Sequence, residues 1–189
     1  MMELQEAVLK RRSVRRFTED IVTDQELQQI FETVRWSPSW GNTQVWEFVV
    51  VRDRALIQKV TETYQMDKGT NPATKCSLAA SALIVVCAKT GVSGCKGGKE
   101  STKYSNWFMF DLGLATQTLC LKAHEMGLGT VVVGLLDHDV CRKLIALPDG
   151  YETVAVIPIG RPAVEPKGGP PRKTVADMVH LDMFGKKIF

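Results

Sequence analysis

The chain has 189 residues, of which 44% are hydrophobic and 24% charged, and this composition excludes disorder as the default state. Its formal net charge of +3 is well below that of a dedicated nucleic-acid-binding domain, so we expect no nucleic-acid partner. The longest apolar runs, residues 79–88 and 127–136, are too short to span a bilayer, and the acidic N-terminus differs from a signal peptide, so we expect a cytoplasmic protein without a membrane partner.

The first part of the chain is predicted to contain two amphipathic helices followed by a buried strand. Apolar spacing predicts a short helix over residues 3–10. Thr23 and Glu26 form a capping box, which predicts a second helix that ends before Pro38. Trp46–Val51 is rich in β-branched residues and therefore predicts a buried strand.

The middle of the chain contains a second buried strand and the longest predicted helix. Residues 56–60 have apolar side chains at helical spacing, and residues 83–87 predict a strand. The glycine-rich residues 91–99 predict a loop. A helix is predicted from about residue 104 to residue 126, with Gly127 as its C-terminal stop. Because this helix is apolar over much of its surface, we expect it in a core or an interface.

The last third of the chain is predicted to end in an extended arm. Residues 130–133 and 154–159 predict strands, and residues 137–144 predict a capped helix. Residues 160–173 are rich in proline and glycine, and residues 175–189 carry apolar side chains that need a partner surface. The predicted helices and strands do not alternate regularly, which favours an α+β fold over a doubly wound sheet. The long arm with its apolar end indicates exchange with a second subunit.

A basic segment follows the first predicted helix, and residues 11–16 place four arginines around Ser13. On its own, this run fits a solvated basic surface, or a kinase or nuclear-import site. It also suits a phosphomonoester, because guanidinium groups form paired hydrogen bonds with phosphate oxygens and the serine hydroxyl adds another. In an extended backbone Arg11, Ser13 and Arg15 would point to one side and converge on one ligand.

Three further features carry candidate ligand-binding groups. The loop at residues 38–46 contains Asn42 and Gln44, whose amides each offer a donor and an acceptor, so it fits either a polar turn or a heterocycle-binding loop. Gly134 directly follows a predicted strand, where its backbone N–H could face a ligand without side-chain obstruction. Arg172 lies in the predicted arm, where a lone arginine is usually solvated.

The sequence contains no pattern that predicts metal binding or nucleophilic catalysis. The five cysteines are odd in number and lack a C-x-x-C pair, which argues against disulfides and a zinc site and favours reduced thiols. His124, His138 and His180 lack the spacing of metal ligands. No phosphate-binding loop, no dinucleotide glycine motif after a strand and no G-x-S-x-G elbow occurs. We therefore predict no metal.

Four segments together resemble, in order and spacing, the nitroreductase family of flavin enzymes. They are R-R-S-V-R at residues 11–15, P-S-x-x-N-x-Q before Trp46, D-L-G to G-L-G over residues 111–129, and G-R-P at residues 160–162 followed by Arg172. This resemblance implies an α+β fold with a central mixed or antiparallel sheet flanked by helices. It also implies a single FMN-binding domain over residues 1–189 and an intertwined homodimer, in which residues 160–189 pack on the partner subunit.

The resemblance also implies a cofactor site built from both ends of the chain. The residues that it assigns to FMN are Arg11, Arg12, Ser13, Arg15, Pro38, Ser39, Asn42, Val133, Gly134 and Arg172. Arg11, Ser13 and Arg172 would hold the FMN phosphate. Arg12 would lie near the phosphate and the ribityl chain, and Arg15 near the N1/C2 carbonyl edge of the flavin.

The remaining assigned residues would lie around the flavin ring. By the resemblance, Pro38 and Ser39 would reach the flavin of the other subunit, and Asn42 would support the same loop. Val133 and Gly134 would offer backbone groups near the flavin atoms N5 and O4. The ring would therefore be bounded by one loop from each of two copies of the chain.

Two more residues are candidates, and two positions depart from the family pattern. Asn71 and Lys75 are candidates for contacts with the pyrimidine edge of the flavin. Val45 stands in place of the family's usual proline, which relaxes the backbone, and Trp40 adds a large ring beside Ser39. The resemblance therefore leaves the substrate class open.

The activity that the resemblance implies is that of an FMN-dependent NAD(P)H oxidoreductase. With NADH or NADPH as donor, it would reduce nitroaromatics, quinones or a similar electron-poor small molecule by ping-pong hydride transfer. Because the flavin supplies the chemistry, no catalytic side chain is assigned. The alternatives are a dehalogenase or flavin-fragmenting enzyme of the same fold, a non-catalytic FMN-binding or storage protein, and, as a distant third, a nucleic-acid contact through the basic segment.

Overall fold

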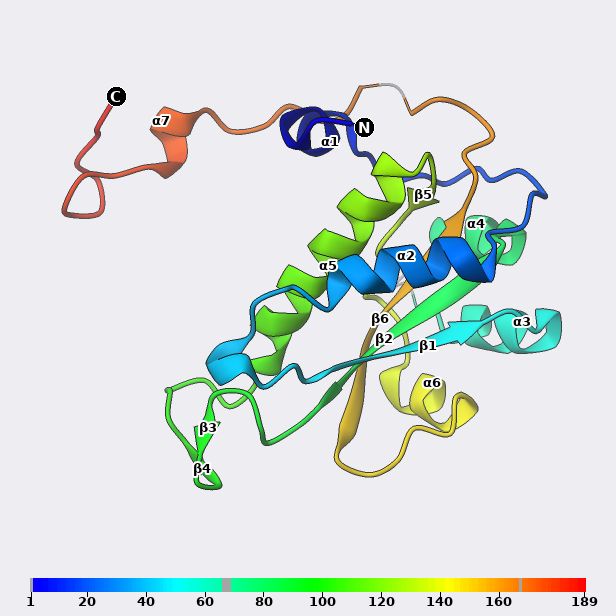
Figure 1. Ribbon diagram of the computed structural model, residues 1–189, viewed down its shortest axis with the longest axis horizontal. Coiled ribbons are helices and arrows are strands. Elements are labelled where there is room, and N and C mark those ends of the chain that lie inside the picture. Colours follow the sequence, from blue (N-terminus) through cyan, green and yellow to red (C-terminus); the bar gives the residue numbers. More distant parts are fainter. Residues whose placement is uncertain (1, 66–68, 167) are drawn as a thin grey trace.

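The computed structural model describes residues 2–65, 69–166 and 168–189 of the chain. At its centre lies a four-stranded antiparallel sheet with the strand order β1-β2-β6-β5 (Figure 1). The strands are β1 (Trp46–Val51), β2 (Ala82–Lys89), β6 (Tyr151–Gly160) and β5 (Gly129–Thr130). An antiparallel sheet flanked by helices confirms the predicted α+β class.

Helices cover both faces of this sheet (Figure 1). They are α1 (Leu4–Lys10), α2 (Asp24–Val34), the 3-10 turn η1 (Trp40–Asn42), α3 (Arg54–Glu62), α4 (Ala73–Ala79), α5 (Phe108–Glu125), α6 (His138–Leu144) and α7 (Val175–Met178). A separate hairpin, β3 (Cys95–Lys96) and β4 (Lys99–Glu100), precedes α5. Among the residues described, no helix combines the length and the hydropathy needed to cross a membrane.

Strand β2 lies at the centre of the hydrophobic core, because both of its faces are buried. Ile84 and Val86 belong to the cluster that α2 and α5 complete on one face of the sheet. Leu83 and Val85 belong to the cluster that α3 and α6 complete on the other face. Since side chains alternate between the two faces of a strand, one continuous apolar run serves both layers.

The helix predicted from the Thr23–Glu26 capping box is α2. The Thr23 hydroxyl accepts a hydrogen bond from the Glu26 amide at 3.2 Å, and the Glu26 carboxylate accepts one from the Thr23 amide at 2.9 Å. The strand predicted at Trp46–Val51 coincides with β1. The long predicted helix is α5, which begins at Phe108, a few residues later than the apolar spacing indicates.

The strand predicted at residues 130–133 is interrupted. Thr130 pairs with Ile159 in β5 and β6, and Val133 pairs with Val156 in the same register. Pro158 falls between these two pairs and has no N–H to donate. The ladder therefore breaks at this point, and the chain leaves the sheet for two residues before it returns at Val133.

The sequence predicts a loop over residues 91–99, but part of this segment forms the hairpin β3–β4. Gly97 and Gly98 connect the paired residues Lys96 and Lys99, with φ angles of 58° and 75°. Two successive residues with positive φ are what a type I′ turn requires, and glycine adopts this conformation without strain. Glycine content indicates turns and loops alike, so composition alone does not reveal the pairing.

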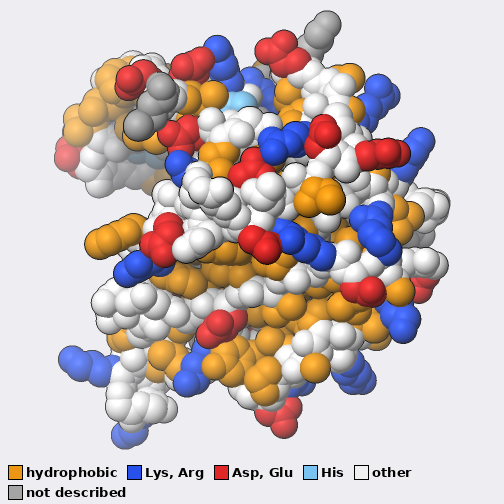
Figure 2. Space-filling model, turned by 45° about the vertical axis from the view of Figure 1, so that its right-hand side comes forward, with side chains coloured by type: hydrophobic (Ala, Val, Ile, Leu, Met, Phe, Trp, Pro, Cys, Tyr) orange, Lys and Arg blue, Asp and Glu red, His pale blue; other side chains and the backbone are white. Residues whose placement is uncertain are grey.

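The arm predicted after residue 160 leaves the sheet and continues to α7 and the C-terminus, which Figure 1 shows set apart from the sheet. Several apolar side chains of this segment are exposed, and Phe184 is 94% exposed. On the face seen in Figure 2, basic and acidic side chains are interspersed over the surface rather than separated by sign.

The basic segment is attached to the sheet beside β5. The Val14 amide donates to the Thr130 carbonyl at 2.9 Å, in a parallel bridge between Ser13 and Thr130. Gly129 makes this approach feasible, because a Cβ at Gly129 would lie 2.6 Å from the Val14 Cβ. Gly129 therefore leaves the space in which the Val14–Thr130 hydrogen bond can hold the basic segment against β5.

We predict that Gly129→Ala destabilises the protein. The added methyl group overlaps Val14 at a site fixed by backbone pairing, and such overpacking costs about 1–3 kcal/mol. The control is Gly113→Ala on α5, where a Cβ meets no atom within 4 Å. Thermal unfolding of both variants measures the effect, and an unfolding midpoint of Gly129→Ala equal to that of the control contradicts the prediction.

Candidate functional site

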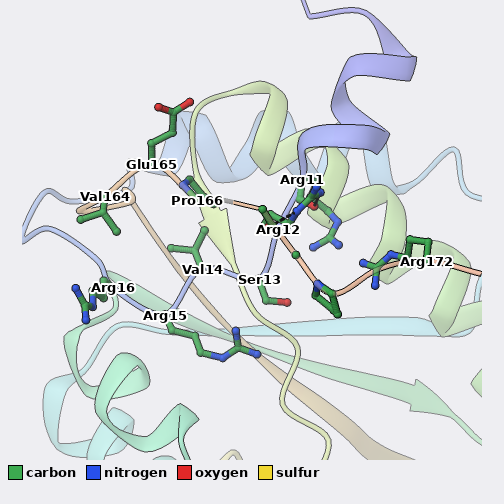
Figure 3. A pocket seen from close by; sticks show the side chains of 13 residues that line it. Arg11, Arg12, Ser13, Val14, Arg15, Arg16, Val164, Glu165, Pro166 and Arg172 are labelled. Atoms are coloured by element: carbon green, nitrogen blue, oxygen red, sulfur yellow. Dashed lines mark hydrogen bonds between the residues drawn. The ribbon is translucent and has the colours of Figure 1, made fainter.

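Two segments from opposite ends of the chain enclose a cavity of about 730 Å³. One wall consists of residues 11–16, and the other of residues 164–166, residues 168–170 and Arg172 (Figure 3). The predicted phosphate-binding residues Arg11, Ser13 and Arg172 all line this cavity, as do Arg12 and Arg15. The structure therefore brings Arg11 and Ser13, from the N-terminal part of the chain, to the same cavity as Arg172 from the C-terminal arm.

The backbone of the basic segment orients its side chains. Val14 is buried against β5 and its amide bonds Thr130, so the alternation of an extended chain turns Ser13 and Arg15 to the opposite side. Figure 3 shows this arrangement, with Arg172 on the same side of the cavity as Ser13. The buried valine therefore sets the direction in which the polar groups point.

The cavity carries positive charge without matching acidic groups. Among the ion pairs of the described residues, none includes Arg11, Arg15 or Arg172. Glu165 also lines the cavity, but it is exposed at the rim. Burial lowers the pKa of His124 on α5, and the nearby positive charge of Arg11 lowers this pKa further. Such a site favours an anion.

Arg12 has a different role from that of its neighbours. Its Nε donates to the Gly168 carbonyl at 2.7 Å, and its Nη1 donates to the Leu9 and Arg11 carbonyls at 2.6 and 2.9 Å. A Cβ at Gly169 would lie 2.9 Å from the Arg12 Nε, so a larger residue there would require the Arg12 side chain to shift. Arg12 thus ties the arm to the end of α1, whereas the resemblance assigned it to the phosphate and the ribityl chain.

Arg15 lines the cavity and also lies near α4, and Val133, which precedes Gly134, packs against Cys76 of the same helix. The positive charge of Arg15 is close enough to Cys76 of α4 to lower the pKa of that thiol, although burial raises it more strongly. Val133 exchanges two backbone hydrogen bonds with Val156, so its N–H is not available to a ligand. Among the described residues, the Gly134 amide has no acceptor and remains the better candidate of the two.

Asn71 and Lys75, the two candidates for contacts with the pyrimidine edge of the flavin, differ in their surroundings. The Asn71 side chain donates to the Gln65 carbonyl at 3.1 Å and accepts from the Ala73 amide at 2.9 Å. It therefore organises the start of α4, a helix that the apolar spacing of the sequence does not predict. Lys75 is exposed on α4. Asn71 is committed to local structure, while Lys75 remains available.

The loop at residues 38–46 lies away from the cavity within one chain. The Trp40 amide donates to Asp111 in the first turn of α5, whereas Arg11 lies near His124 in its last turn. Thirteen residues of helix separate these two points, a distance of about 20 Å. The structure therefore does not bring Pro38, Ser39 and Asn42 to the basic cavity of the same chain.

The backbone of this loop is strained. Gly41, Asn42 and Gln44 have φ angles of 54°, 58° and 46°. For residues other than glycine this conformation costs on the order of 1–3 kcal/mol and is concentrated at functional sites. Because a proline disfavours a left-handed residue before it, Val45 in place of proline is compatible with the conformation of Gln44.

The comparisons with known proteins agree with this arrangement. Residues 8–161 match the sequence pattern of the nitroreductase family. The match includes the basic segment, the strained loop, α5 and the whole central sheet. The chain therefore belongs to the nitroreductase family, as the sequence predicts.

Two curated relatives are similar over most of the chain. A protein of Archaeoglobus fulgidus, provisionally named as an NADH dehydrogenase/NAD(P)H nitroreductase, is 29% identical over 169 residues, which cover 87% of this chain and 88% of that protein. An NADPH-dependent oxidoreductase of Staphylococcus epidermidis is 23% identical, covering 95% of this chain and 73% of that protein.

Solved structures share the fold. A nitroreductase family protein of Clostridium novyi NT has a TM-score of 0.77 at 25% identity, covering 99% of this chain and 97% of that chain. An FMN-dependent nitroreductase of Clostridium difficile R20291 has a TM-score of 0.75 at 24% identity, covering 94% of this chain and 98% of that chain. At 24% identity, the similarity to this second structure concerns the fold alone.

We predict that Arg12→Ala loosens the arm. Loss of three hydrogen bonds to carbonyl groups should raise amide hydrogen exchange in residues 163–172 at least about tenfold. The control is Arg16→Ala, which removes the same charge from the cavity wall but, among the described residues, breaks no side-chain hydrogen bond. Equal exchange in the two variants would show that Arg12 does not hold the arm.

Proposed function

We propose that the protein is an FMN-dependent NAD(P)H oxidoreductase that reduces nitroaromatics, quinones or a similar electron-poor small molecule. The observation that carries this proposal is the gathering of Arg11, Ser13 and Arg172 at one cavity without an acidic partner among the described residues. Membership of the nitroreductase family and the oxidoreductase names of the relatives support it.

The residues present fit FMN. Guanidinium groups and a serine hydroxyl match the oxygen atoms of a phosphomonoester, and these three residues converge from the two ends of the chain. Arg15 lines the same cavity and lies near Cys76 of α4, and Val133, which precedes Gly134, packs against Cys76 as well. A ligand with an anionic end and a polar ring edge matches a phosphate-type cluster with further donors on the side of α4.

The chain's residues would bind and orient FMN rather than react. When bound, FMN supplies the hydride-transfer chemistry between NAD(P)H and the acceptor. Arg11, Ser13 and Arg172 hold the phosphate, and Arg12 keeps the arm in place. Arg15 would offer positive charge to the pyrimidine edge of the bound flavin. Because donor and acceptor would use one open face in turn, we expect ping-pong kinetics.

We further propose a homodimer in which residues 160–189 pack on the partner subunit. The strained loop at residues 38–46 lies about 20 Å along α5 from the basic cavity of its own chain. A second copy could bring the loop of one chain to the cavity of the other. Phe110 on α5 and Phe184 at the C-terminus are exposed apolar side chains that such an interface would cover.

We predict that the purified protein binds FMN and that Arg172→Ala weakens this binding about 10- to 100-fold, because one charged hydrogen-bond partner of the phosphate is lost. The matched control is Lys173→Ala, which removes the neighbouring charge. Fluorescence titration with FMN and with riboflavin, which has no phosphate, measures the effect, and riboflavin affinity should be equal in both variants.

Two results would contradict this proposal. A protein that stays colourless after addition of FMN does not contain the proposed site. Bound flavin that neither NADH nor NADPH bleaches under anaerobic conditions would instead favour a storage or binding protein.

We predict that removing residues 174–189 weakens self-association. These residues carry exposed apolar side chains that we expect to be buried against a second copy. Light scattering after size-exclusion chromatography should give a dimer for the full chain and a larger monomer fraction for the truncated chain, with Phe184→Ser as the milder variant. A full chain that is monomeric at micromolar concentration contradicts the proposed dimer.

A further inference from the structure

Asp111 is a buried carboxylate at the start of α5, with an exposed fraction of 1%. Its Oδ1 accepts a hydrogen bond from the Trp40 amide at 3.1 Å, and its Oδ2 accepts one from the Ser93 hydroxyl at 2.6 Å. Among the described residues, no basic side chain forms an ion pair with it. Burying a carboxylate without a cation costs free energy of folding, so its two hydrogen bonds indicate a specific role.

One of these hydrogen bonds holds the strained loop. Within residues 38–46, the Asn42 amide bonds the Ser39 carbonyl, and the Gln44 amide bonds the Ser39 hydroxyl at 2.9 Å. These bonds shape the turn but do not attach it to the rest of the protein. The Trp40 amide donates to Asp111 and attaches the turn to α5. Left-handed residues persist where their surroundings hold them in this way.

The other hydrogen bond holds the segment that carries the β3–β4 hairpin. Ser93 is buried, and the Ser101 amide bonds the Gly94 carbonyl at 2.8 Å, which closes the base of the hairpin. Gly94 packs on Trp107, where a Cβ would lie 2.7 Å from the Trp107 Cβ. The hairpin therefore sits on the beginning of α5, within one turn of Asp111.

A carboxylate suits this junction because both of its oxygens act only as acceptors. An amide N–H and a hydroxyl from two different loops can then donate to one side chain at the same time. The strained loop and the hairpin, separated by about 50 residues of sequence, thus share one anchoring group.

We propose that Asp111 is a positioning residue that fixes the loop at residues 38–46 and the hairpin segment at residues 91–101 as one unit, and thereby sets how an acceptor reaches the open face of the flavin. The part that concerns the acceptor rests on the proposed function. The part that concerns the two loops rests on the hydrogen bonds of Asp111 alone.

The first test is amide hydrogen exchange on the full chain, with or without FMN. Asp111→Leu, which offers no acceptor, should raise exchange at least about tenfold in both segments together. Asp111→Asn, which can accept from Trp40 and donate to Ser93, should restore near wild-type exchange. A change in one segment alone, or in neither, overturns the proposal.

Ser93→Ala keeps the proposal testable if Asp111→Leu does not fold. It removes one of the two hydrogen bonds and should raise exchange in the hairpin segment and, to a smaller extent, in the loop at residues 38–46. A change confined to the hairpin overturns the coupling. The control is Thr118→Val on α5, which breaks the 3.0 Å hydrogen bond from Ser37 but leaves Asp111 intact. It should leave exchange in the hairpin unchanged.

The second test is steady-state kinetics with 1,4-benzoquinone and 4-nitrobenzoate as acceptors. Asp111→Leu should raise KM for the acceptor about tenfold with a smaller change in kcat, and Asp111→Asn should restore it. An unchanged KM overturns the role of Asp111 in acceptor access. A wild-type protein without flavin or activity would refute the proposed function, whereas the exchange experiment would still decide whether Asp111 couples the two loops.

Discussion

Four arginine side chains within six residues repel one another, and the structure holds them together through backbone contacts. The hydrogen bond from the Val14 amide to the Thr130 carbonyl fixes the middle of the basic segment. The Arg12 guanidinium donates hydrogen bonds to a carbonyl group of α1 and to one of the arm. The charge of Arg11 stays without an acidic partner among the described residues and acts on the pKa of His124. Charge held in this way favours the binding of an anion in the cavity.

Helix α5 separates the basic cavity from the strained loop at residues 38–46. Its last turn lies beside the basic cavity, and its first turn holds the strained loop through Asp111. Because a helix of 18 residues is rigid and about 27 Å long, these two features cannot meet within one chain. The family resemblance assigns both features to one flavin site, and such a site would need a second chain.

The sequence carries most of the fold in local patterns, which is why α2, β1 and α5 were predicted from a capping box, a β-branched run and apolar spacing. The first wall of the basic cavity follows from the sequence as well, because residue types that recognise phosphate cluster around Ser13. The role of Arg12 was not predicted, because its partner Gly168 lies 156 residues away and nothing local marks the contact. The break at Pro158 was missed because the proline interrupts pairing in the neighbouring strand, not in its own.

The loop at residues 38–46 shows how strain and anchoring depend on one another. Gln44 adopts a left-handed conformation that a following proline would disfavour, and Val45 permits it. The loop therefore lacks the rigidity that proline confers and needs an external support, which Asp111 provides through the Trp40 amide. Since the same carboxylate also accepts a hydrogen bond from Ser93, the support of the loop extends to the segment that carries the glycine-rich hairpin. One buried carboxylate thus connects the conformation of the loop at residues 38–46 to that of the hairpin segment.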